Sequence, residues 1–102
     1  MLEGQHKPLD LAKRVLDNEA ISSVRDCAQL HLRGWKILDR WAFNSPEKLT
    51  ALAKSGEVLF LGRLLEQQEL EHNVLLDATE ILNTGTPEHE VLEMNHIQTE
   101  LL

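Results

Sequence analysis

The apolar residues of this chain are of a kind that favours helices over strands. Twenty leucines and seven alanines stand against five valines and four isoleucines, and tyrosine is absent. Leucine and alanine have high helix propensity, whereas strands are enriched in β-branched and aromatic residues. The sequence therefore predicts an all-α fold. A chain of 102 residues suits one domain, so we expect a single helical domain over 1–102, with flexible ends at 1–7 and 100–102.

Helix-breaking residues divide the chain into five expected helices. Proline favours the first turn of a helix, and glycine favours the position just after its end. Pro8, Ser45-Pro46, Ser55-Gly56 and the run from Asn83 to Pro87 provide these signals. The expected helices cover residues 8–18, 23–43, 46–55, 57–82 and 87–102. We expect them to form a compact bundle of four to five helices.

The fourth expected helix, over residues 57–82, is apolar on more than half of its circumference. Such a helix is covered on more than one side, so we place it at the centre of the bundle or in a dimer seam. A polar stretch at residues 66–73 interrupts it. Twenty leucines are also more than a chain of this size readily buries, which predicts a homodimer. The interface candidates are Trp41, Phe60, Leu61, Leu65, Leu75 and Leu76.

The second expected helix, over residues 23–43, has an apolar stripe and a basic back. Gly34 lies near the stripe, where close approach of another helix would compensate for its low helix propensity. Cys27 and His31 fall one turn apart on the stripe, and with Gln68 they are candidates for a buried polar cluster. A thiol beside an imidazole can become a nucleophile, but catalysis also needs an orienting group and an oxyanion site, and the sequence offers neither. We therefore expect no catalysis.

Charge is unevenly distributed along the chain. Residues 1–50 carry eight Lys/Arg and seven Asp/Glu, a net charge of +1, whereas residues 51–102 carry two and ten, a net charge of −8. Nucleic-acid-binding proteins need basic patches, so the acidic half argues against a nucleic-acid partner and against an anionic membrane surface. Since the sequence has neither an apolar run of about 20 residues nor an apolar N-terminal signal, we expect a cytoplasmic location.

Two Glu-x-x-His pairs, Glu69 with His72 and Glu93 with His96, offer ligands for a metal ion. The spacing resembles half of the ligand pattern of ferritin-like di-iron bundles, which also need a lone glutamate from each of two further helices. The helix expected at 23–43 contains no glutamate. Helical phase directs His72 inward, with Glu69 at the edge of that face, and directs the second pair outward. A metal site would therefore need a second subunit, with iron, zinc or manganese as candidate ions. Otherwise no cofactor is expected.

The uneven charge and the surplus of apolar helix surface favour a function in binding. We expect a small non-catalytic interaction protein, such as an adaptor, inhibitor or regulatory subunit. Its acidic C-terminal half, including Glu88, Glu90 and Glu93, would face a basic protein through electrostatic steering and apolar contact. The alternatives are a metal-binding bundle completed across a homodimer interface and a purely structural homo-oligomer.

Overall fold

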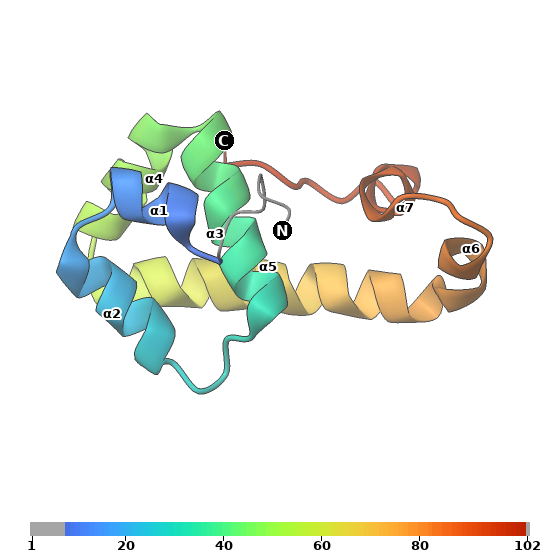
Figure 1. Ribbon diagram of the computed structural model, residues 1–102, viewed down its shortest axis with the longest axis horizontal. Helices are drawn as coiled ribbons and strands as arrows, with labels where there is room; N and C mark the ends of the chain where they lie inside the picture. The colour runs from blue at the N-terminus through green and yellow to red at the C-terminus, as the bar shows by residue number, and fades with distance from the viewer. Residues whose placement is uncertain (1–7, 102) are drawn as a thin grey trace, which may run out of the picture.

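The computed structural model describes residues 8–101, which form helices and connecting segments without any strand (Figure 1). The all-α prediction is confirmed. Seven helices occur in this part of the chain instead of four to five, because two of the expected helices are each divided in two. The helices are α1 (Asp10–Val15), α2 (Asn18–Asp26), α3 (Leu32–Asn44), α4 (Pro46–Lys54), α5 (Glu57–Asp77), α6 (Thr79–Asn83) and α7 (Glu88–Met94).

Aspartate side chains cap the first two helices. Asp17 accepts a hydrogen bond from the Ala20 N–H at 2.9 Å, so α2 begins five residues earlier than we expected. At α1 the capping carboxylate comes from another helix, because Asp39 of α3 accepts the N–H groups of Leu9 at 2.8 Å and Ala12 at 2.9 Å. Capping bonds satisfy backbone donors that a helix leaves without intrahelical partners. Asp39 therefore attaches α1 to α3.

The prediction of one continuous helix over residues 23–43 is wrong, because the helix is interrupted in its middle. The chain leaves the helical conformation after α2 and passes through a loop at residues 27–31 before α3 begins. Gln68 on α5 holds this loop, since its amide accepts the His31 N–H at 3.0 Å and donates to the Gln29 carbonyl at 2.9 Å. These long-range bonds replace hydrogen bonds that a continuous helix would make, and no glycine or proline in the loop signals the break.

Gly34 of α3 lies in close contact with Gln68 of α5, as its position predicted. A Cβ atom at this residue would overlap the Gln68 side-chain oxygen and would come within 2.8 Å of the Leu30 side chain. Only glycine therefore allows Gln68 to reach the loop in its present position.

The later helices also end earlier than expected. The helix predicted for residues 57–82 is continuous through 66–73 but is interrupted at Ala78, which separates α5 from α6. The helix expected to reach the C-terminus ends at Met94, and His96 has a left-handed backbone with φ of 58°. The chain then returns to the first helices along a non-helical segment (Figure 1).

Most of the apolar side chains form one core between α1, α2, α3, α4 and the first half of α5. We call residues 9–64, which contain these helices, the body. Among the described residues, the core of the body contains fourteen buried apolar residues. One of them, Leu101, comes from the far end of the chain. They are Leu9, Ala12, Leu16, Ile21, Val24, Leu30, Ile37, Leu38, Trp41, Ala42, Leu49, Phe60, Leu64 and Leu101.

A second, smaller apolar cluster lies at the other end of α5. We call residues 74–97 the C-terminal lobe, and the non-helical segment at residues 98–101 that returns to the body the strap. The buried residues of the lobe cluster are Leu75, Ala78, Val91 and Leu92. Figure 1 shows α6 and α7 at one end of the long α5 helix, away from α1, α2 and α4. Among residues 8–101, no helix is both long and apolar enough to cross a lipid bilayer.

Candidate functional site

A cleft of about 630 Å³ lies between the body and the C-terminal lobe. Cationic side chains of α3 line one side of it, and carboxylates from α5, α7 and the strap line the others. The charged residues of the lining are Arg33, Lys36, Arg40, Glu71, Glu88, Glu93 and Glu100, together with His89. The cleft is therefore rich in charge of both signs.

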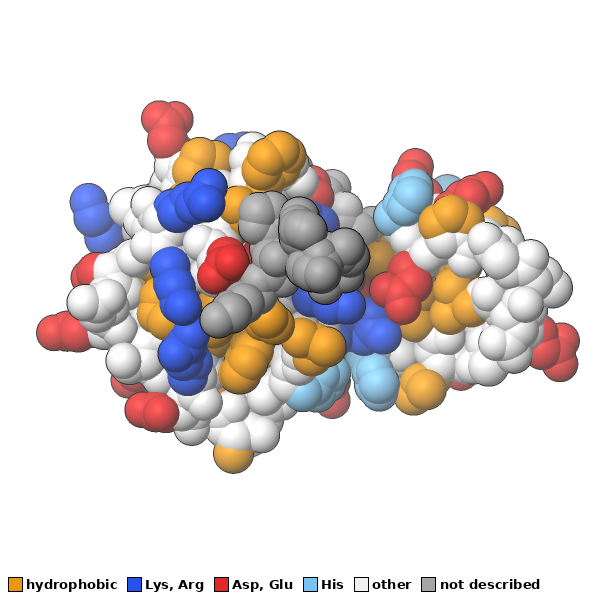
Figure 2. Space-filling model, in the orientation of Figure 1, with side chains coloured by type: hydrophobic (Ala, Val, Ile, Leu, Met, Phe, Trp, Pro, Cys, Tyr) orange, Lys and Arg blue, Asp and Glu red, His pale blue; other side chains and the backbone are white. Residues whose placement is uncertain are grey.

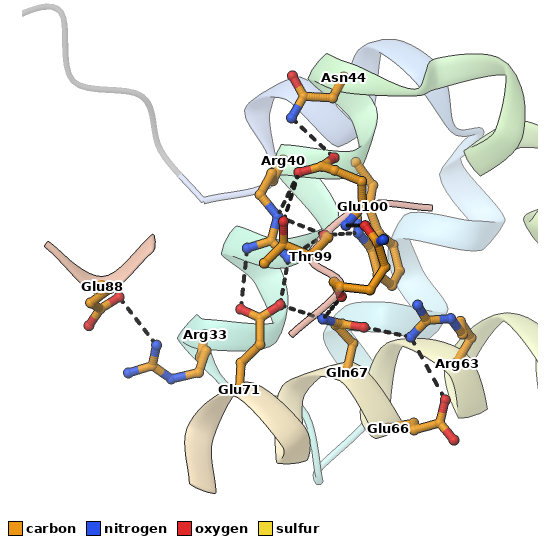
Figure 3. A network of polar contacts seen from close by, with 12 residues as sticks. Arg33, Arg40, Asn44, Arg63, Glu66, Gln67, Glu71, Glu88, Thr99 and Glu100 are labelled. Carbon is orange, nitrogen blue, oxygen red and sulfur yellow. Dashed lines mark hydrogen bonds and ion pairs between the residues drawn. The ribbon is translucent and has the colours of Figure 1, made fainter. Parts of the chain in front are cut away.

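The floor of the cleft is a buried ion pair between α3 and α5 (Figure 3). Arg40 donates to both carboxylate oxygens of Glu71, at 3.2 Å and 2.6 Å, and Glu71 is only 2% exposed. Gln67 donates a further hydrogen bond to Glu71 at 2.6 Å. A buried carboxylate with this many hydrogen-bond donors is fully compensated, so it has a structural role.

The same network attaches the strap to the body. The carbonyl oxygen of Thr99 accepts from Arg40 at 2.6 Å and 3.1 Å and from the Trp41 indole at 2.8 Å. Asn44 donates to Glu100 at 3.1 Å, and Leu101 is buried in the body core. We expected residues 100–102 to be flexible, but Glu100 and Leu101 are held by these contacts. Residues 1–7 and 102 lie outside the described residues.

Only part of the predicted buried polar cluster is buried. Gln68 is 4% exposed and Cys27 is half-buried against the body core, but the His31 side chain is exposed. The reason is the loop at residues 27–31, which removes Cys27 and His31 from a common helix face. The His31 imidazole instead caps α3, where its Nδ1 atom accepts the Arg33 N–H at 3.3 Å.

The Glu-x-x-His pairs do not form a metal site within the described part of the chain. Glu69 is exposed and His72 half-buried, while His96 lies beyond the end of α7 and so shares no helix face with Glu93. Among residues 8–101, no group of three or more His, Cys, Asp and Glu side chains could hold a metal ion. The metal-binding alternative still needs ligands from a second chain and stays a prediction.

The interface candidates divide between core and surface. Trp41, Phe60 and Leu75 are buried inside the chain's own two cores, with exposed fractions of 0%, 2% and 4%, so they are not on the surface of the monomer. Leu61 and Leu65 are half-buried against the body core. Among these candidates, only Leu76 is largely exposed, at 58%. The homodimer itself stays a prediction.

The acidic residues predicted to face a partner lie on the surface of the C-terminal lobe. Glu88, Glu90 and Glu93 are exposed, as are Asp77 and Glu80. The sequence contains no lysine or arginine after Arg63. In the view of Figure 2, acidic, apolar and histidine side chains cover the lobe, while most of the basic side chains lie on the body.

Exposed apolar side chains of the lobe accompany its acids. Leu76 is 58% exposed, Ile81 40% and Met94 58%. Of these three residues, only Leu76 was predicted to lie at an interface. On α7, Val91 and Leu92 are buried in the lobe cluster, whereas Met94, the last residue of the helix, lies outside it.

Comparison with known proteins does not add to these observations. No family model matches the chain, and neither a curated protein nor a solved structure matches it.

Proposed function

We propose that this chain is a non-catalytic binding protein whose C-terminal lobe receives a basic, amphipathic segment of a partner protein. One observation carries the proposal. Residues 74–97 contain five acidic residues and no lysine or arginine, yet three of their large apolar side chains are at least 40% exposed. Exposed apolar side chains within a single-sign charged surface are typical of a binding site.

The two kinds of side chain would contribute differently to binding. The acids attract a basic segment over a distance and so raise the association rate, an effect that salt screens. The apolar side chains contribute affinity at short range, because contact with the partner removes them from water. A partner with lysines on one face of a helix and leucines on the other would satisfy both requirements.

Binding would also stabilise the lobe. Its own cluster buries only four residues, so much of its apolar surface remains in contact with water. A ligand that binds the folded state and not the unfolded state shifts the equilibrium towards folding. We expect a partner to protect the backbone amides of α6 and α7 from hydrogen exchange.

The test uses two synthetic peptides of identical leucine and lysine composition. In one, the order places the leucines on one face of a helix, and in the other the order is scrambled. Fluorescence anisotropy measures the affinity of the full chain for each peptide. We expect tighter binding of the amphipathic peptide, and a loss of affinity when salt is raised from about 0.05 M to about 0.5 M.

A matched pair of variants locates the binding surface. Glu90→Gln with Glu93→Gln removes two charges from the lobe, and we expect it to weaken binding about tenfold, an effect of about 1.4 kcal/mol. Glu19→Gln with Glu47→Gln removes two exposed charges from α2 and α4 on the body and should leave the affinity unchanged. Equal loss in the two double variants, or equal affinity for the two peptides, would contradict the proposal.

The expected homodimer has its own candidate surface. The outer face of α5 exposes Val58, Leu59, Leu70 and Leu76, at 44% to 83%. If two copies associate through this face, Leu59→Lys with Leu70→Lys gives a monomer in sedimentation velocity at a concentration where the unmodified chain is a dimer. A chain that sediments as a monomer without substitution contradicts the dimer prediction.

A further inference from the structure

A second cavity, of about 240 Å³, lies at the N-terminal end of α3 where α5 and α7 approach it. It adjoins the larger cleft, with which it shares Arg33, Lys36 and Glu88. Nitrogen-bearing side chains predominate in its lining, which consists of His31, Leu32, Arg33, Lys36, His72 and Glu88. The lining has two permanent cations and one carboxylate, so it is positive in a chain whose net charge is −7.

Two of the lining residues have buried nitrogen atoms without a hydrogen-bond partner. Within the described residues there are three such side-chain atoms, and Arg33 Nε and His72 Nδ1 are two of them. Buried polar groups in folded proteins are nearly always hydrogen-bonded, so an unpaired one indicates a partner that the protein itself does not supply. That both belong to one cavity points to a shared ligand.

The donors of the cavity indicate what kind of ligand this is. Since His31 Nδ1 accepts the Arg33 N–H, the neutral imidazole carries its proton on Nε2, which makes that atom a donor. Arg33 and Lys36 can only donate. Lys36 is exposed and has no acidic side chain within ion-pair distance among residues 8–101. A ligand that meets several donors at once needs several acceptor atoms.

A metal ion does not fit this set of side chains. The rings of His31 and His72 lie 5.5 Å apart between centroids, edge to face, which brings two imidazoles together. However, the guanidinium of Arg33 and the ammonium of Lys36 repel a cation, and the only carboxylate of the lining is paired with Arg33 at 3.3 Å. The charge of the site therefore favours an anion.

We propose that this cavity binds the phosphate group of a small ligand. A phosphate presents several acceptor oxygens, matches the planar fork of arginine and is attracted by the positive N-terminal end of the 13-residue helix α3. The adjoining cleft of about 630 Å³ leaves room for an organic remainder attached to the phosphate. The inference does not depend on the partner surface proposed above, with which this cavity shares only Glu88.

Inorganic phosphate is the first probe, added to the full chain at constant ionic strength with chloride as the reference anion. We expect a saturable rise in melting temperature that chloride does not produce. O-phosphoserine is the second probe, and serine its control. Tighter binding of O-phosphoserine than of inorganic phosphate identifies a phosphomonoester ligand, and the reverse order identifies the free anion. The absence of a saturable response to both would overturn the proposal.

Variants distinguish specific binding in the cavity from a general effect of positive charge on the surface. Lys36→Gln removes an exposed, unpaired cation, so it should leave the fold intact and weaken phosphate binding about tenfold. Lys13→Gln on α1 makes the same change of charge away from the cavity and should have no effect. Arg33→Lys keeps the charge but removes Nε, and we expect a severalfold weaker affinity. Equal losses in the Lys36 and Lys13 variants would show that no specific site exists.

Discussion

The body and the C-terminal lobe share the helix α5, yet they differ in how completely each covers it. Within the described residues, fourteen buried apolar side chains surround the first half of α5, and the lobe cluster contains four. The body core contains Trp41 and Phe60, whereas the lobe cluster has no aromatic residue. Because stability increases with the apolar area removed from water, we expect the body to be the more stable of the two regions.

The two regions also differ in charge. The body, residues 9–64, carries nine Lys/Arg and seven Asp/Glu, a net charge of +2, whereas the lobe, residues 74–97, carries five acids and no Lys/Arg, a net charge of −5. Like charges on a small unit repel one another and oppose its compact state. The weaker core therefore coincides with the stronger self-repulsion. This contrast agrees with the binding surface that we propose on the lobe, because ligand-binding segments are commonly among the less stable parts of a protein.

The largest expected effect compares one leucine from each core. Leu64→Ala removes a fully buried side chain of the body and should cost about 2–5 kcal/mol of unfolding free energy. Leu92→Ala in the lobe should cost less, because the lobe can open while the body stays folded. Urea unfolding measures the first quantity. Hydrogen exchange should show loss of protection in the second variant confined to residues 78–97. Equal losses of global stability would mean that the two regions unfold as one unit.

The next effect concerns the ion pair where the strap meets the body. Glu71→Leu leaves Arg40 without its buried partner and should destabilise the chain by about 3 kcal/mol. Replacing both residues, with Arg40→Met as the second change, should recover part of this loss, because no buried charge of the pair then remains; Glu100, which also pairs with Arg40 at 3.4 Å, is one-third exposed. Urea unfolding of the two single variants and the double variant measures the coupling. Additive losses would show that the pair contributes nothing beyond its separate side chains.

Alanine substitutions at two glycines test how tightly the body is packed. Gly34→Ala places a methyl group against Gln68 and Leu30 and should cost about 1–3 kcal/mol. Gly62 lies on an open face of α5, where an added Cβ would meet no atom within 4 Å. Gly62→Ala should therefore stabilise the helix by up to about 1 kcal/mol. Thermal unfolding of the two variants measures the difference in sign. The same sign in both would mean that α3 and α5 can separate without cost.

The smallest effect concerns the ion pair between α3 and the lobe. Arg33 and Glu88 lie 3.3 Å apart, and Glu88 is 59% exposed, so Glu88→Gln should cost less than about 1 kcal/mol. The loss should be visible at low salt and should disappear at about 0.5 M salt. Glu90→Gln, which removes an exposed charge without an ion pair, is the control and should be neutral or slightly stabilising. A larger loss in Glu88→Gln would mean that this pair determines the position of the lobe.

Local signals in the sequence predicted the features that depend on neighbouring residues. Proline at 46 and glycine at 56 correctly placed α4, and the position of Gly34 near the apolar stripe correctly indicated a close helix contact. The exposure of Glu88, Glu90 and Glu93 was also predicted, since charged side chains rarely lose contact with water. These features follow from the properties of short segments.

The features that the sequence did not predict depend on residues far apart in the chain. The loop at residues 27–31 is held by Gln68, about forty positions further on, and the strap is held by Arg40 and Trp41, almost sixty positions earlier. Gln68 was predicted for a buried polar cluster with Cys27 and His31, but its hydrogen bonds to the loop, like those of Arg40 to the strap, depend on backbone groups that only the fold brings close.

The sequence by itself determined that the chain is helical and that its charge is divided between its halves, since propensity and charge belong to individual residues. Only the tertiary structure decided which leucines are covered, which histidines meet and which acids remain free. Trp41 and Leu76 were both predicted at an interface, but Trp41 lies in the core of the body and Leu76 on the surface of the lobe. Burial is a property of a residue together with its neighbours in space, and those neighbours exist only in the folded chain.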